Sequence, residues 1–275
     1  MSQISQPKVA AATAPPAESS MMDRDAAVDE AFEHLGFPVA AWASIPDGEF
    51  LMGSPEGEEG RRNNDERQHL VRVAAFQMLR TSVTFAMFDA FCAATGREKP
   101  KDQGWGRDTR PVIWVSYWDA ADYAAWLSAQ TGWNCRLPTE AEWEYACRAG
   151  SATPFWTGAT ITPDQANYHG HYSYGHGPKG VYREKTTPVG QFPPSPWSLH
   201  DLHGNVWEWC ASKYDATYAG LERQDASRAR LSQDARVLRG GSWSDFPAWV
   251  RSAFRNWSTP TNRFGNAGFR LARSP

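Results

Sequence analysis

Apolar residues recur at helical spacing in three segments of the chain, and each segment has a start and a stop signal. In the third, Thr139 precedes the apolar stretch as a possible N-cap, Glu142 can reach back to complete a capping box, and Gly150 provides a stop. At the start of the second segment, Ser116 is the possible N-cap and Asp119 can complete a capping box with it. The predicted helices cover residues 85–94, 117–131 and 140–147, the first starting after Thr84 and ending before Gly96.

Extended segments are short and few. They cover residues 50–53, 70–78, 206–209 and 237–238. Residues 152–201, and all residues from 240 to the end, show neither helical nor strand periodicity. Unpatterned segments of this length inside a compact domain are usually functional or held by an ion. The pattern predicts an α+β fold with small antiparallel sheets, two or three helices and much irregular loop.

Composition is ordinary for a compact protein, with 28 basic and 31 acidic residues and 41% hydrophobic residues. The balanced charge gives no reason to expect a nucleic acid as partner. No apolar run reaches the roughly 20 residues that a membrane span needs, so we expect no membrane partner. Residues 1–38 are rich in Ala, Pro and Ser without a secretory pattern, which predicts a disordered leader, a single domain over 39–275 and a cytoplasmic location.

Aromatic content is high, with 14 Trp among 275 residues, which favours a ring-packed interior or an aromatic binding face. The four cysteines are scattered and lack zinc-binding spacing. They are predicted to be small buried thiols, although the sequence leaves pairing open. The cysteines are Cys92, Cys135, Cys147 and Cys210.

Four segments, in order along the chain, resemble the signature segments of the formylglycine-generating enzyme (sulfatase-modifying factor) superfamily. They are RLPTEAEWEY at 136–145, HGNVWEW at 203–209, RGGSW at 239–243 and GFR at 268–270. The resemblance covers nearly the whole chain after residue 46. It implies a variant of the C-type lectin fold, in agreement with the pattern of short elements and long loops.

The superfamily includes copper-dependent oxidases, iron-dependent sulfoxide synthases and pure binding proteins, among them the variable proteins of diversity-generating retroelements. In the oxidases two cysteines follow the GGS-aromatic segment, and this chain has Asp245 and Val250 at those positions. Because thiolates select Cu(I), the resemblance predicts a member without this oxidase activity. The sulfoxide synthases take three iron-binding histidines from a separate helical domain, whereas His34 is the one histidine that precedes this domain. A loop cluster of His169, His171 and His176 keeps a metal-dependent oxidoreductase as the alternative.

One calcium ion is expected in the loop before the third signature segment. Asp201 and Glu208 are seven residues apart with a glycine between them, which suits an oxygen-ligated cation. The resemblance implies that these two side chains bind calcium together with the carbonyls of Gly204 and Val206. The family's other calcium site is not expected, because Lys179 falls where an Asp would be, although Asn167 matches one ligand.

The C-terminal segment alternates family-like framework residues with aromatic and small polar residues, a composition typical of binding loops. The framework arginines Arg251, Arg255 and Arg270 are expected to pair with carboxylates, with Glu140 and Glu144 as possible partners, and Trp243 is expected in the core. We predict that the remaining residues bind a protein or peptide and, by resemblance, that they are diversified by a retroelement; carbohydrate binding is a second alternative, and oligomeric state is left open. The predicted binding residues are Ser244, Asp245, Phe246, Ala248, Trp249, Phe254, Asn256, Trp257, Asn262, Phe264 and Asn266.

Overall fold

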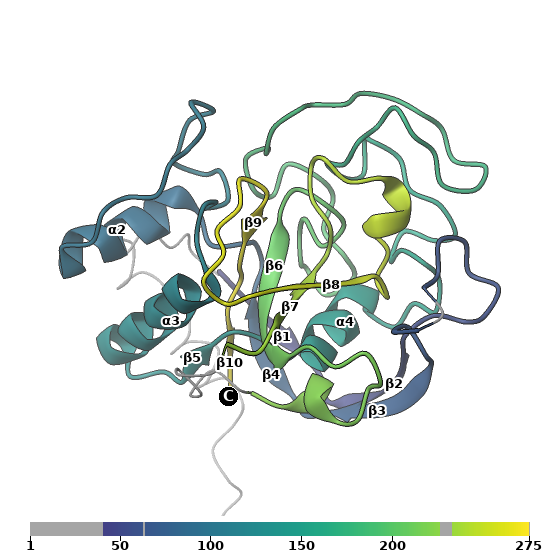
Figure 1. Ribbon diagram of the computed structural model, residues 1–275, viewed down its shortest axis with the longest axis horizontal. Coiled ribbons are helices and arrows are strands. Elements are labelled where there is room, and N and C mark those ends of the chain that lie inside the picture. The colour runs from purple at the N-terminus through teal and green to yellow at the C-terminus, as the bar shows by residue number, and fades with distance from the viewer. Residues whose placement is uncertain (1–40, 63, 226–232, 275) are drawn as a thin grey trace, which may run out of the picture.

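The computed structural model describes residues 41–62, 64–225 and 233–274. The predicted leader, residues 1–38, lies outside the described residues. Within them, short strands near the middle of the molecule are joined by long loops, and the helices lie around the strands (Figure 1). The predicted α+β class with small sheets and much irregular loop is confirmed.

The three predicted helices are present, and their capping residues are those that the sequence indicates. In α2 the Thr84 hydroxyl accepts a hydrogen bond from Met87 N, and both later helices begin with complete capping boxes. The last helix extends one residue beyond the predicted range, to Arg148, and Ala149 and not Gly150 takes the left-handed cap position, at φ 43°. The helices are α2 (Phe85–Thr95), α3 (Tyr117–Thr131) and α4 (Glu140–Arg148).

Three small sheets have the strand orders β1-β4-β10-β5, β2-β3 and β8-β7-β6-β9. The strand pairs are antiparallel, as expected, except that β6 and the two-residue strand β9 pair in parallel. The strands are β1 (Trp42–Ile45), β2 (Gly48–Met52), β3 (His69–Val73), β4 (Phe76–Leu79), β5 (Cys135–Arg136), β6 (Trp207–Lys213), β7 (Arg236–Arg239), β8 (Arg255–Ser258), β9 (Ala267–Gly268) and β10 (Ala272–Arg273).

The segment 70–78, expected to be one extended run, contains two strands in different sheets. β3 pairs with β2, and β4 pairs with β1 and β10. Ala74 and Ala75, between them, are both exposed, so the alternation of buried and exposed side chains changes phase at this point. Since a one-residue change of phase turns every following side chain to the other face, a single strand cannot continue through it.

Two large hydrophobic clusters pack on either side of the sheets. One lies under α2 and α3 and includes Phe88, Tyr123 and Phe269, whose rings contact one another. The other lies around α4 and includes Trp143, which is fully buried. All four cysteines are buried and unpaired, as predicted.

Buried ion pairs connect loops that are far apart in sequence. Arg255 makes two hydrogen bonds to Glu140, of 2.6 and 2.8 Å, which confirms one of the expected pairs. Arg251 binds Glu66 instead, at 2.9 and 3.0 Å, and also pairs with Glu58. Such pairs are stable in the interior only when the hydrogen-bonding capacity of both partners is met.

Among the residues that the structure describes, no helix has the length and the apolar character needed to cross a membrane.

Candidate functional site

The loop after β7 leads into the segment where the family's copper ligands would stand. Gly240 and Gly241 both have positive φ, 93° and 71°. A Cβ on Gly241 would lie 2.5 Å from Val250 Cγ1, so only glycine allows the chain to return this close to itself. The turn carries Ser242 and Trp243 past the 201–206 loop, where Trp243 N donates to the Asn205 carbonyl over 3.0 Å. The 3-10 helix η3 (Pro247–Trp249) follows.

A small polar cluster forms behind this turn. The Ser242 hydroxyl donates to the Asp245 carboxylate, and Asn266 Nδ2 donates to the Ser242 and Ser244 hydroxyls over 3.2 and 3.4 Å. Asp245 is buried, with 8% exposed. Burial raises the pKa of this carboxyl to about 6, although the hydrogen bond from Ser242 acts in the opposite direction. Three of the predicted binding residues are therefore joined in one network.

Val250 lies in a hydrophobic cluster with Phe155 and Tyr168 and is fully buried. Its side chain has no donor atom, and its carbonyl accepts a hydrogen bond from His203 Nδ1 at 2.7 Å. The Cys147 thiol donates a hydrogen bond to the Ser252 hydroxyl at 3.5 Å, and burial raises the pKa of this thiol to about 12. The residues at the two copper positions do not fit a thiolate-bound copper ion.

An aromatic face surrounds the polar cluster. We use this name for seven side chains whose rings form a continuous series of contacts. His169 stacks on Tyr182 at 3.7 Å between ring centroids, Tyr172 meets Phe246 at 4.5 Å, and Phe246 meets Trp249 at 5.7 Å. The aromatic face consists of Trp105, His169, Tyr172, Tyr182, Trp243, Phe246 and Trp249.

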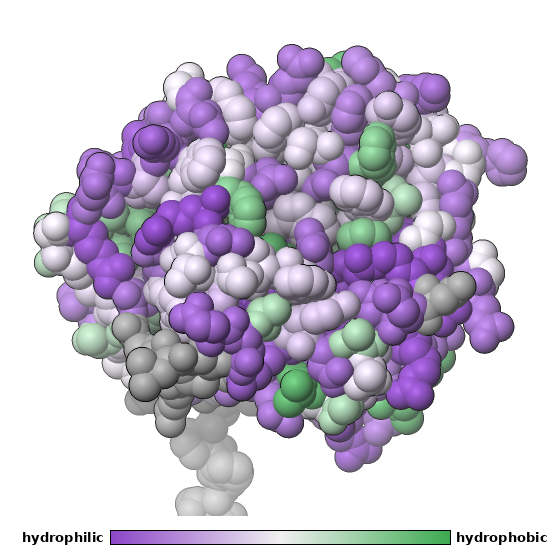
Figure 2. All heavy atoms as spheres, viewed as in Figure 1, coloured by the Kyte–Doolittle hydropathy of each residue, from purple (hydrophilic) through white to green (hydrophobic). Residues whose placement is uncertain are grey.

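The rings of the aromatic face come from three loops and are open to solvent. Tyr172 is 47% exposed, Phe246 40% and Trp249 44%. Trp243, expected in the core, is partly exposed and lies edge-on to Trp105 at 5.4 Å. Figure 2 shows the side of the molecule on which β8 lies in front, where residues of intermediate hydropathy cover much of the middle and strongly polar residues lie around it.

The structure divides the other predicted binding residues. Phe254 is buried, with its ring 5.7 Å from that of Trp249 and 6.0 Å from that of Trp207, so it supports the aromatic face from below. Ala248 and Phe264 are half-buried against hydrophobic clusters. Asn256 and Trp257 lie on β8 and Asn262 on the turn after it; the exposed Trp257 ring packs on Tyr214, apart from the aromatic face.

Five residues of the aromatic face were not predicted as binding residues: His169 was considered for a metal site, Trp243 was expected in the core, and Trp105, Tyr172 and Tyr182 had no predicted role. They lie in loops without periodicity, and the sequence signal available was only their aromatic character.

The loop histidines do not form a metal site. His169 and His171 lie 5.5 Å apart between ring centroids, but His169 is stacked on Tyr182, and the exposed His176 contributes no ring contact to them. Within residues 41–62, 64–225 and 233–274, no group of three or more His, Cys, Asp or Glu side chains is placed to bind a metal ion.

The expected calcium ligands fit only in part. Glu208 accepts four hydrogen bonds: one from Ser82 at 2.7 Å, one from Trp143 Nε1 at 2.7 Å, and two from Arg270 at 2.7 and 2.9 Å. These fill the acceptor sites of both carboxylate oxygens, and the guanidinium would repel a second cation. The Glu208 side chain therefore does not fit a calcium ion.

Asp201 differs from Glu208. Its Oδ2 accepts a hydrogen bond from Gly190 N at 2.8 Å, while its buried Oδ1 has no partner among the described residues. Burial raises the pKa of this carboxyl to about 6. The Gly204 carbonyl, a second expected ligand, accepts from Val206 N at 2.9 Å. Asn167 Oδ1, in the neighbouring loop, is also buried without a partner in the described part of the chain. Two buried oxygen atoms without a hydrogen-bond partner in the described residues are thus present, on Asp201 and Asn167, but they are not the set of calcium ligands that was predicted.

Small sheets, three helices and a site built on long ordered loops define a C-type lectin-like protein of the formylglycine-generating type. The family model for the sulfatase-modifying factor enzyme 1-like domain matches residues 29–275, so the chain belongs to this family. It is 31% identical over 281 residues to the formylglycine-generating enzyme of Streptomyces coelicolor, covering 83% of this chain and 87% of that enzyme.

Two solved structures have the same fold. PvdO from Pseudomonas aeruginosa superposes with a TM-score of 0.76 at 32% identity, covering 87% of this chain and 95% of that one. Variable protein 1 of Treponema denticola superposes with a TM-score of 0.69 at 22% identity, covering 85% and 95%, which is a likeness of fold. The resemblance inferred from the signature segments is confirmed.

Proposed function

We propose that this chain is a ligand-binding member of its family and that its aromatic face recognises a protein or peptide. The observation that carries the proposal is that rings from three loops, three of them exposed, meet around Asp245, in a segment where relatives place their copper ligands. Tyr, Trp and Phe offer large rigid contact areas at a low cost in conformational entropy, and Ser and Asn beside them offer adaptable hydrogen bonds. This combination is typical of protein recognition surfaces.

We also infer that the chain does not convert a cysteine to formylglycine with copper. Asp245 offers a carboxylate already bound by Ser242, and Val250 offers no donor. A soft ion that depends on two thiolates has no suitable ligands there. Diversification by a retroelement is a further hypothesis, which a reverse transcriptase gene beside this one, with a near-copy of the final coding segment, would support.

Selection from a random peptide library displayed on phage tests the binding proposal. The protein is immobilised, and the selected peptides are then measured against the double variant Phe246→Ala/Trp249→Ala. The matched control is Trp257→Ala, an exposed tryptophan that lies apart from the aromatic face. We expect peptides that bind the wild type and the control equally and lose most of their affinity for the double variant, because exposed ring anchors dominate such interfaces. Absence of enriched peptides, or equal binding to all three proteins, would refute the proposal.

Oxygen consumption with a cysteine-containing sulfatase peptide and added copper tests the second inference. We expect no rate above that of copper and peptide alone. Copper-dependent turnover that is abolished by a change in Asp245 would show an oxidase with unexpected ligands, and iron bound in stoichiometric amount after purification would favour the oxidoreductase alternative. A glycan array covers the carbohydrate alternative, since exposed rings also stack on sugars.

A further inference from the structure

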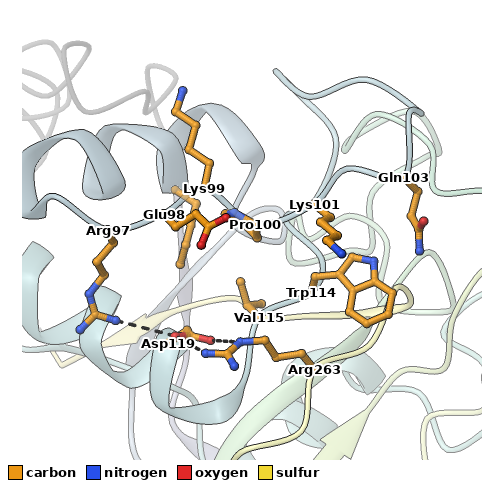
Figure 3. A pocket seen from close by; sticks show the side chains of 11 residues that line it. Arg97, Glu98, Lys99, Pro100, Lys101, Gln103, Trp114, Val115, Asp119 and Arg263 are labelled. Carbon is orange, nitrogen blue, oxygen red and sulfur yellow. Dashed lines mark hydrogen bonds and ion pairs between the residues drawn. The ribbon is translucent and has the colours of Figure 1, made fainter.

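A cavity of about 610 Å³ lies between the loop after α2 and the start of α3, and the proposed function does not use it. Its wall includes Trp114, Val115 and Pro100, while charged side chains surround the opening (Figure 3). This volume is within the range of small-molecule sites, which combine apolar walls with a few polar groups.

Most charges around the cavity are already neutralised. Asp119 pairs with Arg263 at 2.8 Å and with Arg97 at 3.7 Å. Lys99 pairs with Asp89 at 3.2 Å. These paired charges lie around the cavity, and a ligand would not need to supply counter-charges for them.

Two opposite charges remain without a partner. Among the residues that the structure describes, the Lys101 ammonium and the Glu98 carboxylate form no ion pair, either with other groups or with each other. Figure 3 shows Lys101 ending beside the Trp114 ring and the Glu98 carboxylate on the side of the cavity nearer Asp119. The Lys101 ammonium and the Glu98 carboxylate can thus each bind an oppositely charged group of a ligand in the same cavity.

Trp114 supplies the wall beside Lys101 (Figure 3). Its backbone has φ of 60°, a left-handed conformation that is rare for a bulky residue, and its amide donates to the Phe264 carbonyl at 2.9 Å. Strained positions of this kind are concentrated at functional sites. The indole Nε1 is buried without an acceptor in the described part of the chain. The half-buried ring packs against the hydrophobic cluster under α2 and α3, so packing holds it at the cavity.

We propose that this cavity binds a small zwitterion with an aromatic ring, of the chemical class of the free aromatic amino acids. The ligand's carboxylate would bind Lys101, its ammonium would bind Glu98, and its ring would pack on Trp114. A ligand with both charges neutralises both unpaired groups, whereas a simple anion would leave Glu98 unpaired and be repelled by it. Charge-assisted hydrogen bonds at both ends give specificity over uncharged analogues.

Calorimetric titration with three related compounds tests this site. L-Phenylalanine has both charges, L-phenylalaninamide has only the cation, and 3-phenylpropionate has only the anion. We expect L-phenylalanine to bind with a Kd of about 1 mM or below, a reasonable affinity for a ligand of this size, and to bind more tightly than either analogue. Lys101→Gln should weaken L-phenylalanine about tenfold without weakening L-phenylalaninamide, whose ammonium the Lys101 charge repels.

Glu98→Gln should give the complementary result, weakening L-phenylalanine without weakening 3-phenylpropionate, whose carboxylate the Glu98 charge repels. The control is Lys99→Gln, which removes a nearby charge that is already paired with Asp89 and should not affect L-phenylalanine. Three results would overturn the proposal: no heat with L-phenylalanine up to about 10 mM, a concentration ten times the expected Kd; equal affinity for the three compounds; or wild-type affinity in both variants.

Discussion

The Glu208–Arg270 ion pair gives a prediction that also tests whether the Glu208 side chain binds calcium. Both side chains are buried, and Glu208 accepts the four hydrogen bonds described above. These bonds join β6 to Ser82 after β4, to Trp143 on α4 and to Arg270 before β10. Glu208→Gln keeps the size of the side chain but removes its charge and turns one acceptor atom into a donor. Arg270 is then a buried cation without its counter-ion.

The expected loss is large because the remaining charge cannot reach water. Removing one partner of a buried pair typically costs about 3–5 kcal/mol. For a domain of this size each kcal/mol lowers the melting temperature by roughly 2–4 °C, so the total is roughly 6–20 °C. The matched control is Glu49→Gln, which breaks the exposed Glu49–Arg72 pair, whose side chains are 45% and 81% exposed. Exposed pairs contribute about 0–1 kcal/mol, so the control should melt close to wild type.

Thermal and urea unfolding would be measured with calcium and with a chelator. If Glu208 acts through Arg270, the loss is the same in both conditions. If Glu208 is a calcium ligand, the wild type is stabilised by calcium and the variant loses that stabilisation. A loss below about 1 kcal/mol, the range of an exposed pair, or a loss seen only with calcium, contradicts the role derived from the structure. A calcium effect that Asp201→Asn removes and Glu208→Gln keeps would place the ion at Asp201.

Three further changes have defined outcomes. Burial raises the pKa of Asp245 to about 6, above its unfolded value of 3.8, so between these two pH values the folded state binds one proton more than the unfolded state. The contribution of Asp245 to stability is therefore present at low pH and is lost as pH rises from about 4 to 6. Asp245→Asn should therefore flatten the pH dependence of urea unfolding in that window, and an unchanged slope would contradict the burial effect. Thr139→Ala removes the hydroxyl that accepts from Glu142 N and should cost about 1 kcal/mol of unfolding free energy, with Thr139→Ser as the conservative control. Phe254→Ala, which removes a buried ring, should cost about 3–5 kcal/mol, whereas Trp249→Ala should cost much less, and equal losses in calorimetry would mean that Trp249 belongs to the core.

The helices were predictable because their signals are local. Thr139 and Glu142 are three residues apart, and a capping box needs only those two side chains and the backbone between them. The shortest strands were not predictable for the opposite reason. β9 and β10 have two residues each, too few to show alternation, and they are strands only because β6, β4 and β5 lie beside them.

The composition of the aromatic face could be predicted from the sequence, but its extent could not. Aromatic and small polar residues after β7 indicated a surface, and Phe246 and Trp249 are exposed there. Exposure of a single ring, however, depends on what packs over it: Phe254 has Trp207 and Trp249 against it, and the sequence does not contain that information. Tyr172 and Tyr182 join the face through a loop more than sixty residues away, which only the folded chain brings near.

The buried arginines explain how the site can change while the fold persists. Arg251 binds Glu66 across 185 residues of sequence and Arg255 binds Glu140 across 115, and neither ion pair includes a residue of the aromatic face. Arg239 likewise forms a buried ion pair with Glu144 on α4. Burial alone would raise the pKa of the Glu144 carboxyl, but the charges of Arg148 and Arg239 outweigh burial and lower this pKa. These pairs hold the chain on both sides of the loop between Gly240 and Arg251, so exposed side chains of this loop, such as Phe246 and Trp249, contribute little to the framework, whereas the buried Asp245 is part of it. If the proposed function holds, substitution of these exposed side chains would change what the surface binds at a small cost in stability.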